Sequence, residues 1–151
     1  MDIDRVRKQL EIDEGVKYEI YEDHLGYKTF GIGHLVLDTD PEVDMPIGTV
    51  VTHQRVEDAF ETDFNISVAE CSVLYQEKWN TFPEEVQEIL VNMMFNLGRP
   101  RLGKFKNMRK ALEEQKWKLA ADEGRDSLWY RQVGGRAARL MSRLENVESN
   151  R

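Results

Sequence analysis

The sequence predicts an α+β fold, with a small N-terminal β lobe and a mainly helical C-terminal lobe joined by a long helix. Two patterns support this prediction. Residues 16–21 alternate between apolar and polar positions, as in a strand with one apolar face. From residue 52 onward, apolar residues instead recur at steps of three and four, as in amphipathic helices. The length of 151 residues suits one domain with a substantial buried core.

The N-terminal segment predicts a short helix over residues 2–14, since Ile3, Val6 and Leu10 share one helical side. Gly15 is a plausible C-cap for this helix. After the strand at residues 16–21, the tetrapeptide "DHLG" predicts a turn. The following "YKTFGIGH" predicts a second strand, whose glycines weaken its strand propensity. An irregular connection then follows, in which a short third strand is expected at Thr49–Val51.

The rest of the chain predicts helices. Thr52 is a good N-cap for a long linking helix at about residues 52–72. Thr81 is expected to cap the next helix, with Pro83 in its first turn and Glu84 completing a capping box. This helix is apolar nearly all round, which indicates a buried central position, and Gly98 ends it. Further helices separated by glycines follow.

We therefore expect a single domain over residues 1–151. Its parts are a β lobe at about 16–51, the linking helix, and a helical lobe at about 73–151 that also includes the helix at 2–14.

The net charge of −7 divides unevenly along the chain. Residues 1–96 contain 7 basic and 21 acidic residues, whereas residues 97–151 contain 14 basic and 7 acidic residues. The basic part could face a polyanion, such as an anionic wall polymer, or could simply attract the acidic part. Nucleic acid is not the expected partner, because the basic residues are scattered and no nucleic-acid-binding motif accompanies them.

Three further features bear on the compartment. The sequence contains no run of about 18 apolar residues, so no membrane span or stable membrane association is expected. The first residues lack the apolar stretch of a signal peptide, which predicts synthesis in the cytoplasm without one. Cys71 is the only cysteine, so no internal disulfide can form, and a structural, half-buried position is expected for it.

Two acidic residues, Glu14 and Asp23, stand out by their positions. They lie nine residues apart, which on one continuous helix would place them on opposite sides. The break at Gly15 and the strand and turn that follow can instead carry Asp23 back towards Glu14. Two converging carboxylates, one protonated and one ionised, are what glycoside hydrolysis requires. The end of a helix disfavours negative charge, so Glu14 is the better acid. Spacing alone leaves open that both are ordinary surface acids.

A set of motifs resembles the phage-type lysozyme family, the phage T4 lysozyme-like muramidases of glycoside hydrolase family 24. The N-terminal positions follow the pattern "DEG…YxDxxGYxTxGIGH", here Asp13-Glu14-Gly15, Tyr21, Asp23, Gly26-Tyr27, Thr29 and Gly31–His34. The resemblance continues in the same order with "NMMFNLG" (92–98), "GKF" (103–105), Trp117, "WYRQ" (129–132) and "GRAARL" (135–140). Only residues 36–51 have no match.

This resemblance implies a lysozyme-like fold with an active-site cleft between the two lobes. It implies hydrolysis of the β-1,4 bond between N-acetylmuramic acid and N-acetylglucosamine in bacterial peptidoglycan, with inversion of the product anomer. By family role, Glu14 is the general acid, Asp23 positions or activates the attacking water, and Thr29 helps to hold that water.

Four more positions match the family less firmly. Leu35 and Phe95 match residues that line the sugar groove, so they are candidate substrate-binding residues. His34 and Arg136 are candidate supporting residues: His34 is expected to be structural, and Arg136 matches an arginine that pairs with the catalytic glutamate.

No cofactor or metal is expected. His34 has no second ligand at a suitable spacing for a metal ion. The Gly31–Gly33 segment lacks the third glycine and the following helix of a dinucleotide site.

The family implies a muramidase, most simply a monomeric phage endolysin that a holin releases to the periplasmic or cell-wall peptidoglycan. Two alternatives remain. A lytic transglycosylase on a related fold would keep the glutamate but would not need a water-positioning aspartate. A catalytically silent peptidoglycan-binding module would have no need to keep Glu14, Asp23 and Thr29 together.

Overall fold

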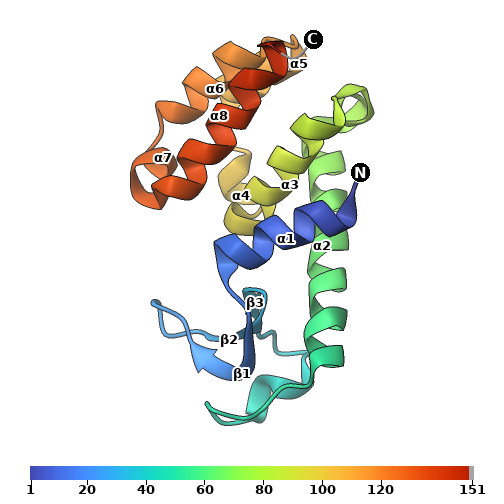
Figure 1. Cartoon of the computed structure of the whole chain (residues 1–151), viewed down its shortest axis with the longest axis vertical. Coiled ribbons are helices and arrows are strands. Elements are labelled where there is room, and N and C mark those ends of the chain that lie inside the picture. The colour runs from blue at the N-terminus through green and yellow to red at the C-terminus, as the bar shows by residue number, and fades with distance from the viewer. Residues whose placement is uncertain (150–151) are drawn as a thin grey trace. The chain divides into compact units, whose positions relative to one another are not determined.

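The structure, a computed structural model, describes residues 1–149 and the side chains through residue 147. It is mainly helical, with a three-stranded antiparallel sheet near the N-terminus, so the predicted α+β fold is confirmed (Figure 1). The chain forms two compact units, Asp2–Ile66 and Ser67–Arg151 together with Met1. The predicted limits of the lobes, within one domain, stay a prediction. Among the described residues, no helix is long and apolar enough to cross a membrane.

The first unit begins with helix α1 (Ile3–Glu14), as the apolar spacing predicts. The carboxylate of Asp2 caps the helix by accepting the backbone N–H of Arg5, at 3.2 Å. Val6 and Leu10 on its apolar side are buried. The helix ends at Gly15, whose φ of +78° turns the chain into the sheet, so the predicted C-cap is confirmed.

The sheet consists of β1 (Lys17–Glu22), β2 (Lys28–Gly31) and β3 (His34–Leu35), in that order. The prediction of one continuous second strand through His34 is wrong. Gly31 and Gly33 have φ of +63° and +62°. The chain therefore reverses over Gly31–Gly33, between the paired residues Phe30 and His34, and His34 begins β3. The third strand expected at Thr49–Val51 is also wrong, because Val50 makes only an isolated bridge with Glu19.

The sheet leads through the 3-10 helix η1 (Pro41–Asp44) to the long helix α2 (His53–Tyr75). The predicted cap of this helix is confirmed, since the Thr52 hydroxyl accepts the Arg55 N–H at 3.1 Å. Helix α2 packs closely on the sheet: a Cβ at Gly31 would lie 3.1 Å from Val56 Cγ1. The core of this unit includes Leu10, Ile20, Phe30, Ile32, Val56 and Phe60.

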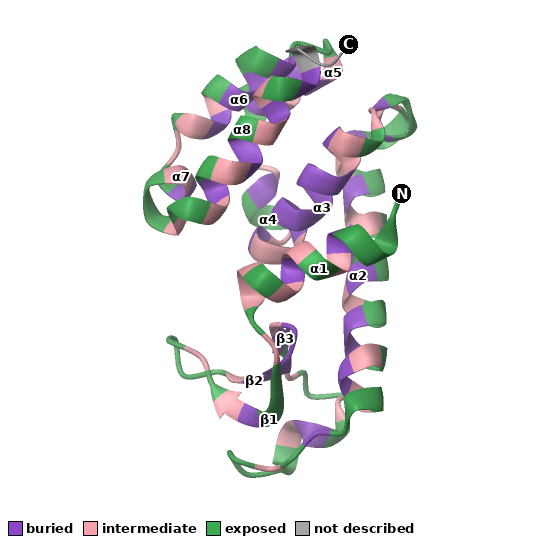
Figure 2. Ribbon diagram, viewed as in Figure 1, coloured by how far each residue is buried: buried purple, intermediate pink, exposed green. Residues whose placement is uncertain are grey.

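The second unit is built around α3 (Glu84–Leu97), which is buried along most of its length, as predicted (Figure 2). Its predicted capping box is wrong. Thr81 belongs to the preceding 3-10 helix η2 (Gln76–Thr81), where its hydroxyl donates to the Lys78 carbonyl, and Pro83 is the N-cap residue of α3. The helix ends at Gly98, whose φ is +76°, as the sequence predicts.

Within the described residues, five further helices follow in this unit, and α6 packs against both α5 and α8. Helices α6 and α8 approach so closely that a Cβ at Gly124 would overlap the Met141 sulfur. Cys71 is fully buried, not half-buried as expected, and burial raises the pKa of its thiol. The five helices are α4 (Arg99–Leu102), α5 (Lys106–Glu113), α6 (Trp117–Arg125), α7 (Leu128–Val133) and α8 (Gly135–Ser149).

Candidate active site

One face of the sheet carries three of the candidate residues, Asp23, Thr29 and Leu35. Thr29 in β2 lies opposite Tyr21 in β1 and opposite Leu35 in β3. The Asp23 N–H donates to the Tyr27 carbonyl at 2.9 Å, so these two residues continue the β1–β2 pairing. Opposed residues share a face, and side chains alternate along a strand. Tyr21, Asp23, Tyr27, Thr29 and Leu35 therefore lie on the same face, which we call the front face.

The opposite face, the back face, packs on α2 and η1. It carries Phe30 and His34, which are paired across β2 and β3 and are both buried. Lys28 extends from the same face, and its ammonium group donates to the carbonyls of Val43 and Met45. The sheet thus separates a structural side from the side that carries the acidic candidate Asp23.

The Asp23 carboxylate is held by only one of its oxygens. Its Oδ1 accepts the backbone N–H groups of Leu25 and Tyr27, each at 2.9 Å, which closes the turn between β1 and β2. Its Oδ2 accepts no hydrogen bond within residues 1–149, and the side chain is partly exposed. A carboxylate fixed in this way has one oxygen oriented and available to accept a proton or a hydrogen bond from a water molecule.

Thr29 is buried, and its hydroxyl donates to the Tyr27 carbonyl at 3.1 Å. This bond uses the hydroxyl proton and leaves the oxygen lone pairs as acceptors. The main chain of Tyr27 thus binds both Asp23 and Thr29. A water molecule beside these two residues would meet acceptor oxygens from both.

Glu14 is the last residue of α1, and its side chain lies against Gly33 in the loop between β2 and β3. A Cβ at Gly33 would lie 2.7 Å from Glu14 Oε1 and 3.1 Å from Glu14 Cβ. A side chain at this loop position would therefore displace the glutamate. The "GIGH" motif supplies the space that Glu14 occupies.

Tyr21 lies near the end of β1, opposite Thr29 in β2, and the charges of both acidic residues act on it. Burial raises the pKa of its phenol, and the negative charges of Glu14 and Asp23 raise it further. Its hydroxyl is therefore within electrostatic reach of both carboxylates. The sequence analysis gave Tyr21 no role. It belongs to the matched motif, and it lies two residues before Asp23, a spacing that puts both side chains on the same face of the strand.

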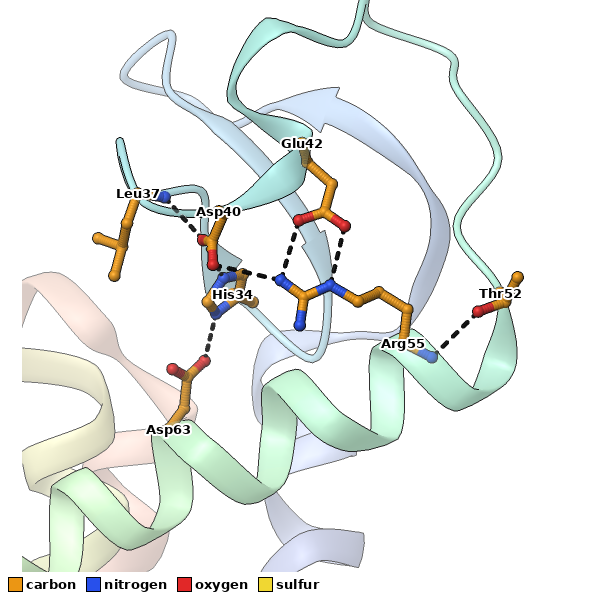
Figure 3. A network of polar contacts seen from close by, with 7 residues as sticks. All are labelled: His34, Leu37, Asp40, Glu42, Thr52, Arg55 and Asp63. Carbon is orange, nitrogen blue, oxygen red and sulfur yellow. Dashed lines mark hydrogen bonds and ion pairs between the residues drawn. The ribbon is translucent and has the colours of Figure 1, made fainter.

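His34 lies on the back face, away from these residues, in a network with α2 and the loop after β3 (Figure 3). Its Nδ1 lies 2.7 Å from Asp63 Oδ2, and its Nε2 lies 2.8 Å from Asp40 Oδ2. Both ring nitrogens face carboxylate oxygens, so His34 donates to both ionised carboxylates at once only when its imidazole is protonated. Burial lowers the pKa of His34, but the hydrogen bonds and charges of Asp63 and Asp40 outweigh burial and raise it.

Arg55 extends this network. Its guanidinium binds both oxygens of Glu42, at 2.8 and 2.9 Å, and Asp40 Oδ1 at 3.2 Å. The hydrogen bond from Arg55 lowers the pKa of Glu42. Burial raises the pKa of Asp40, but the Leu37 N–H and the charges of His34 and Arg55 outweigh it, so that pKa is lowered. The sequence gave no signal for these partners, which come from separate segments.

The remaining candidates are distributed over both units. Leu35 lies on the front face and is 47% exposed. Phe95 is partly exposed on α3, in the other unit. Arg136 is the second residue of α8, and its side chain donates to the Asn92 side-chain oxygen at 2.9 Å and to the Asn92 carbonyl at 3.2 Å. Its pairing with Glu14 stays a prediction. Within residues 1–149, no three metal-binding side chains gather as they would around an ion.

Comparison with known proteins decides the family. The phage lysozyme family model matches residues 11–146, a range that includes every candidate residue. The chain belongs to the phage lysozyme family. The resemblance seen in the motifs is thereby confirmed, and so is the prediction of a lysozyme-like glycoside hydrolase. Membership of this family makes the protein a peptidoglycan hydrolase of the muramidase type.

Individual relatives of this lysozyme come from different sources. It is 30% identical to probable T4-type lysozyme 1 of Dictyostelium discoideum, in an alignment of 168 positions that covers 98% of each chain. It is 29% identical to probable T4-type lysozyme 2 of the same organism, in an alignment of 161 positions that covers 95% of each chain. The pre-baseplate central spike protein Gp5 of Enterobacteria phage T4 is 32% identical over 88% of this chain, but over only 26% of its own length.

Proposed function

We propose that this lysozyme hydrolyses the β-1,4 bond between N-acetylmuramic acid and N-acetylglucosamine in bacterial peptidoglycan. Glu14 is the general acid, Asp23 activates the attacking water, and Thr29 helps to hold that water. The main support is the hydrogen bonding of the Asp23 carboxylate. Two backbone N–H groups fix one of its oxygens, and the other accepts no hydrogen bond within residues 1–149.

The reaction requires two proton transfers. A water molecule bound to Asp23 and Thr29 gives a proton to the Asp23 carboxylate as its oxygen attacks the anomeric carbon of N-acetylmuramic acid. The glycosidic bond breaks, and Glu14 gives its proton to the leaving oxygen of N-acetylglucosamine. Because water attacks from the face opposite the leaving group, the product anomer is inverted, as the family implies.

The other candidates have secondary roles in this proposal. Leu35, exposed on the front face, and Phe95 contact the sugars. His34 supports the sheet from behind, since its bonds to Asp40 and Asp63 hold β3 against α2. Arg136 pairs with Glu14 and so influences how readily the acid gives up its proton.

The held Asp23 carboxylate favours hydrolysis over lytic transglycosylation. A transglycosylase uses an internal hydroxyl of the sugar as nucleophile and needs no carboxylate to activate water. A silent binding module would equally have no use for a carboxylate oxygen kept available in this way.

The test is to digest purified peptidoglycan with the wild type and with Glu14→Gln, and to follow reducing ends together with the product masses. The exchange removes the donated proton and little volume, so activity should fall by about 10² to 10⁴, the usual contribution of a general acid. Glu22→Gln, an exposed acid on β1, is the matched control and should remain active. Full activity of Glu14→Gln would contradict the assignment, and anhydro-sugar products would establish transglycosylation.

We also propose that the enzyme acts as a monomer on periplasmic or cell-wall peptidoglycan, and that a holin releases it if it is an endolysin. Sedimentation velocity of the purified protein would test the monomer. Expression with and without a co-expressed holin, followed by culture turbidity, would test release. Lysis at the same rate without the holin would contradict this route.

A further inference from the structure

A small pocket lies in the second unit, between the end of α2, the 3-10 helix η2 and α5. Its volume is about 240 Å³, below the range of roughly 300–1,000 Å³ that encloses a drug-sized ligand. A pocket of this size suits a group of about the size of one amino acid. The residues that line it include Tyr75, Gln76, Glu77, Lys78, Arg109 and Glu113.

Four charged side chains line this pocket, two of each sign. Lys78 and Arg109 are basic, and Glu77 and Glu113 are acidic. Arg109 and Glu113 form only a loose ion pair, with 3.9 Å between Arg109 Nε and Glu113 Oε1. Within residues 1–149, the Glu77 carboxylate and the Lys78 ammonium group form no ion pair. Charges of both signs are therefore available to a ligand.

Tyr75 lines the same pocket, although only 3% of its surface is exposed. Its ring is held by Trp79, stacked at 6.2 Å between ring centroids, and by Phe82, in an edge-on contact at 5.7 Å. Burial raises the pKa of its phenol, and among the nearby charges Arg109 lowers this pKa and Glu113 raises it. The hydroxyl therefore lies within electrostatic reach of the charged residues of the pocket.

In the part of the chain that the structure describes, the Tyr75 hydroxyl makes no hydrogen bond to another residue. A buried tyrosine hydroxyl usually has a partner, because an unpaired buried donor is unfavourable. The phenol is protonated at neutral pH and so offers a proton to an acceptor in the pocket. An anionic group placed between Tyr75 and Arg109 accepts hydrogen bonds from both.

We propose that this pocket binds the head group of an amino acid, in which one carbon atom carries both an ammonium and a carboxylate group. The carboxylate accepts hydrogen bonds from Tyr75 and Arg109, and the ammonium group lies against the carboxylates of Glu77 and Glu113. A purely anionic ligand would meet two acidic residues here, and a purely cationic one two basic residues. The balance of charge therefore favours a ligand that carries both signs.

Two sources carry this head group. One is a free amino acid, and the other is a wall peptide that contains a diamino acid with one amino-acid centre left free. The two share the chemistry that the pocket recognises. Glu14, Asp23 and Thr29 belong to the other unit, so the inference does not rest on the proposed function.

The test is a titration of the full chain followed by amide chemical shifts. The probes are D-alanine, N-acetyl-D-alanine, which lacks the cation, and D-alaninamide, which lacks the anion. D-Alanine should shift the amides of residues 74–78 and 109–113 to saturation, and each single-charge analogue should bind about tenfold more weakly. Wall peptides with their amino groups free or acetylated form the second arm. Tighter binding of the free form identifies wall peptides as a source, and binding of D-alanine alone identifies the free amino acid.

Tyr75→Phe and Arg109→Gln should each weaken D-alanine binding by about tenfold, because each change removes a donor to the carboxylate. Tyr75→Phe keeps the ring that packs in the core, and Glu113→Gln changes an exposed side chain and should weaken binding as well. Tyr130→Phe and Arg131→Gln on α7 are the matched controls and should bind as the wild type does.

Three results would overturn the site. They are amide shifts that never saturate with D-alanine, equal binding of D-alanine and a single-charge analogue, and wild-type affinity in both Tyr75→Phe and Arg109→Gln. None of the probes contains a glycosidic bond that the enzyme cleaves, except where wall peptides are still attached to sugars. Peptides freed of sugar are therefore used in the second arm, so that binding is measured apart from catalysis.

Discussion

Gly33 leaves no room for any side chain between itself and Glu14. A Cβ at Gly33 would lie 2.7 Å from Glu14 Oε1, and its φ of +62° is one that other residues rarely adopt. The loop that reverses β2 into β3 thus also determines where the proposed acid lies. A structural glycine and the proposed catalytic carboxylate are coupled by contact, although they lie 19 positions apart in the sequence.

Gly33→Ala should reduce kcat at least tenfold, because the new methyl group displaces the Glu14 carboxylate. It should also cost about 1–2 kcal/mol in the free energy of unfolding, the usual penalty for left-handed backbone in a residue with a Cβ. Gly48→Ala is the matched control, since Gly48 has φ of +92° and open space at its Cβ. Both variants should lose stability, and only Gly33→Ala should lose activity. Equal specific activity, corrected for the folded fraction, would contradict the coupling.

Asp23→Asn should abolish hydrolysis while preserving the turn. The amide oxygen can still accept the N–H groups of Leu25 and Tyr27, but the amide nitrogen cannot accept a proton from water. The expected loss of activity is about 10² to 10⁴. Asp23→Ala should lose as much activity and also about 1 kcal/mol of stability, because the two backbone donors lose their partner. Digestion rates and thermal unfolding would separate the two effects. Hydrolysis by Asp23→Asn at the wild-type rate would mean that Asp23 does not activate water.

The local structure around the candidate site could be predicted from the sequence because its determinants are local, whereas the roles of Glu14, Asp23 and Thr29 came from the family resemblance. The helix end at Glu14, the turn after Asp23 and the strand at Thr29 all lie within one short segment. Turn chemistry and strand alternation bring such residues together without long-range information. Residues 36–51 matched no motif, yet they contain Asp40 and Glu42, two of the five side chains in the network behind the sheet.

The errors in the fold prediction arose where two local signals competed or where a partner lay far away in the sequence. Thr81 is a good cap by residue type, but the preceding 3-10 helix already uses its hydroxyl. The "GIGH" segment resembles a weak strand, but two glycines with positive φ make it a loop. The bond between His34 and Asp63 spans 29 residues, and no pattern in the sequence indicates it.

The network around His34 should make stability depend on pH. The pKa of His34 is raised above 6.5, so its contribution is complete below pH 6.5 and is lost as pH rises through the folded-state pKa. The pKa of Asp40 is lowered below 3.8, so its contribution is complete above pH 3.8 and is lost as pH falls through its folded-state pKa. His34 and Asp40 together therefore stabilise the fold most between pH 3.8 and pH 6.5.

Chemical unfolding across a pH series would test this dependence. The difference in unfolding free energy between the wild type and His34→Gln should be largest near pH 5 to 6 and should shrink in alkaline solution. His24→Gln, which changes an exposed histidine of the β1–β2 turn, is the matched control and should follow the wild type. A constant difference across the series would mean that His34 contributes through packing alone.

The last prediction concerns the basic residues at the start of the α4–α5 region. Five basic residues lie close together in the sequence here, namely Arg99, Arg101, Lys104, Lys106 and Arg109, and the structure separates them into paired and unpaired residues. Arg99 pairs with Glu70 at 2.6 Å, and Arg109 lies 3.9 Å from Glu113. Arg101, Lys104 and Lys106 are exposed and form no ion pair within residues 1–149. These three charges are the ones available to an anionic wall, and no internal partner needs to be released first.

Wall binding should therefore weaken as salt rises, because charges are screened beyond roughly 8 Å at physiological ionic strength. At low salt, the excess of acidic residues in positions 1–96 repels an anionic wall, so lytic activity should be highest at moderate salt. The measurement is sedimentation of Glu14→Gln with cell walls across a salt series, with and without Arg101→Glu and Lys104→Glu. Lys118→Glu is the matched control, since this exposed lysine is already paired with Asp122 at 3.2 Å. The double reversal should reduce binding and flatten its salt dependence, because two of the wall-facing cations are then replaced by anions. Binding that is independent of salt, and equal in the reversed and control proteins, would leave glycan contacts as the whole of wall recognition.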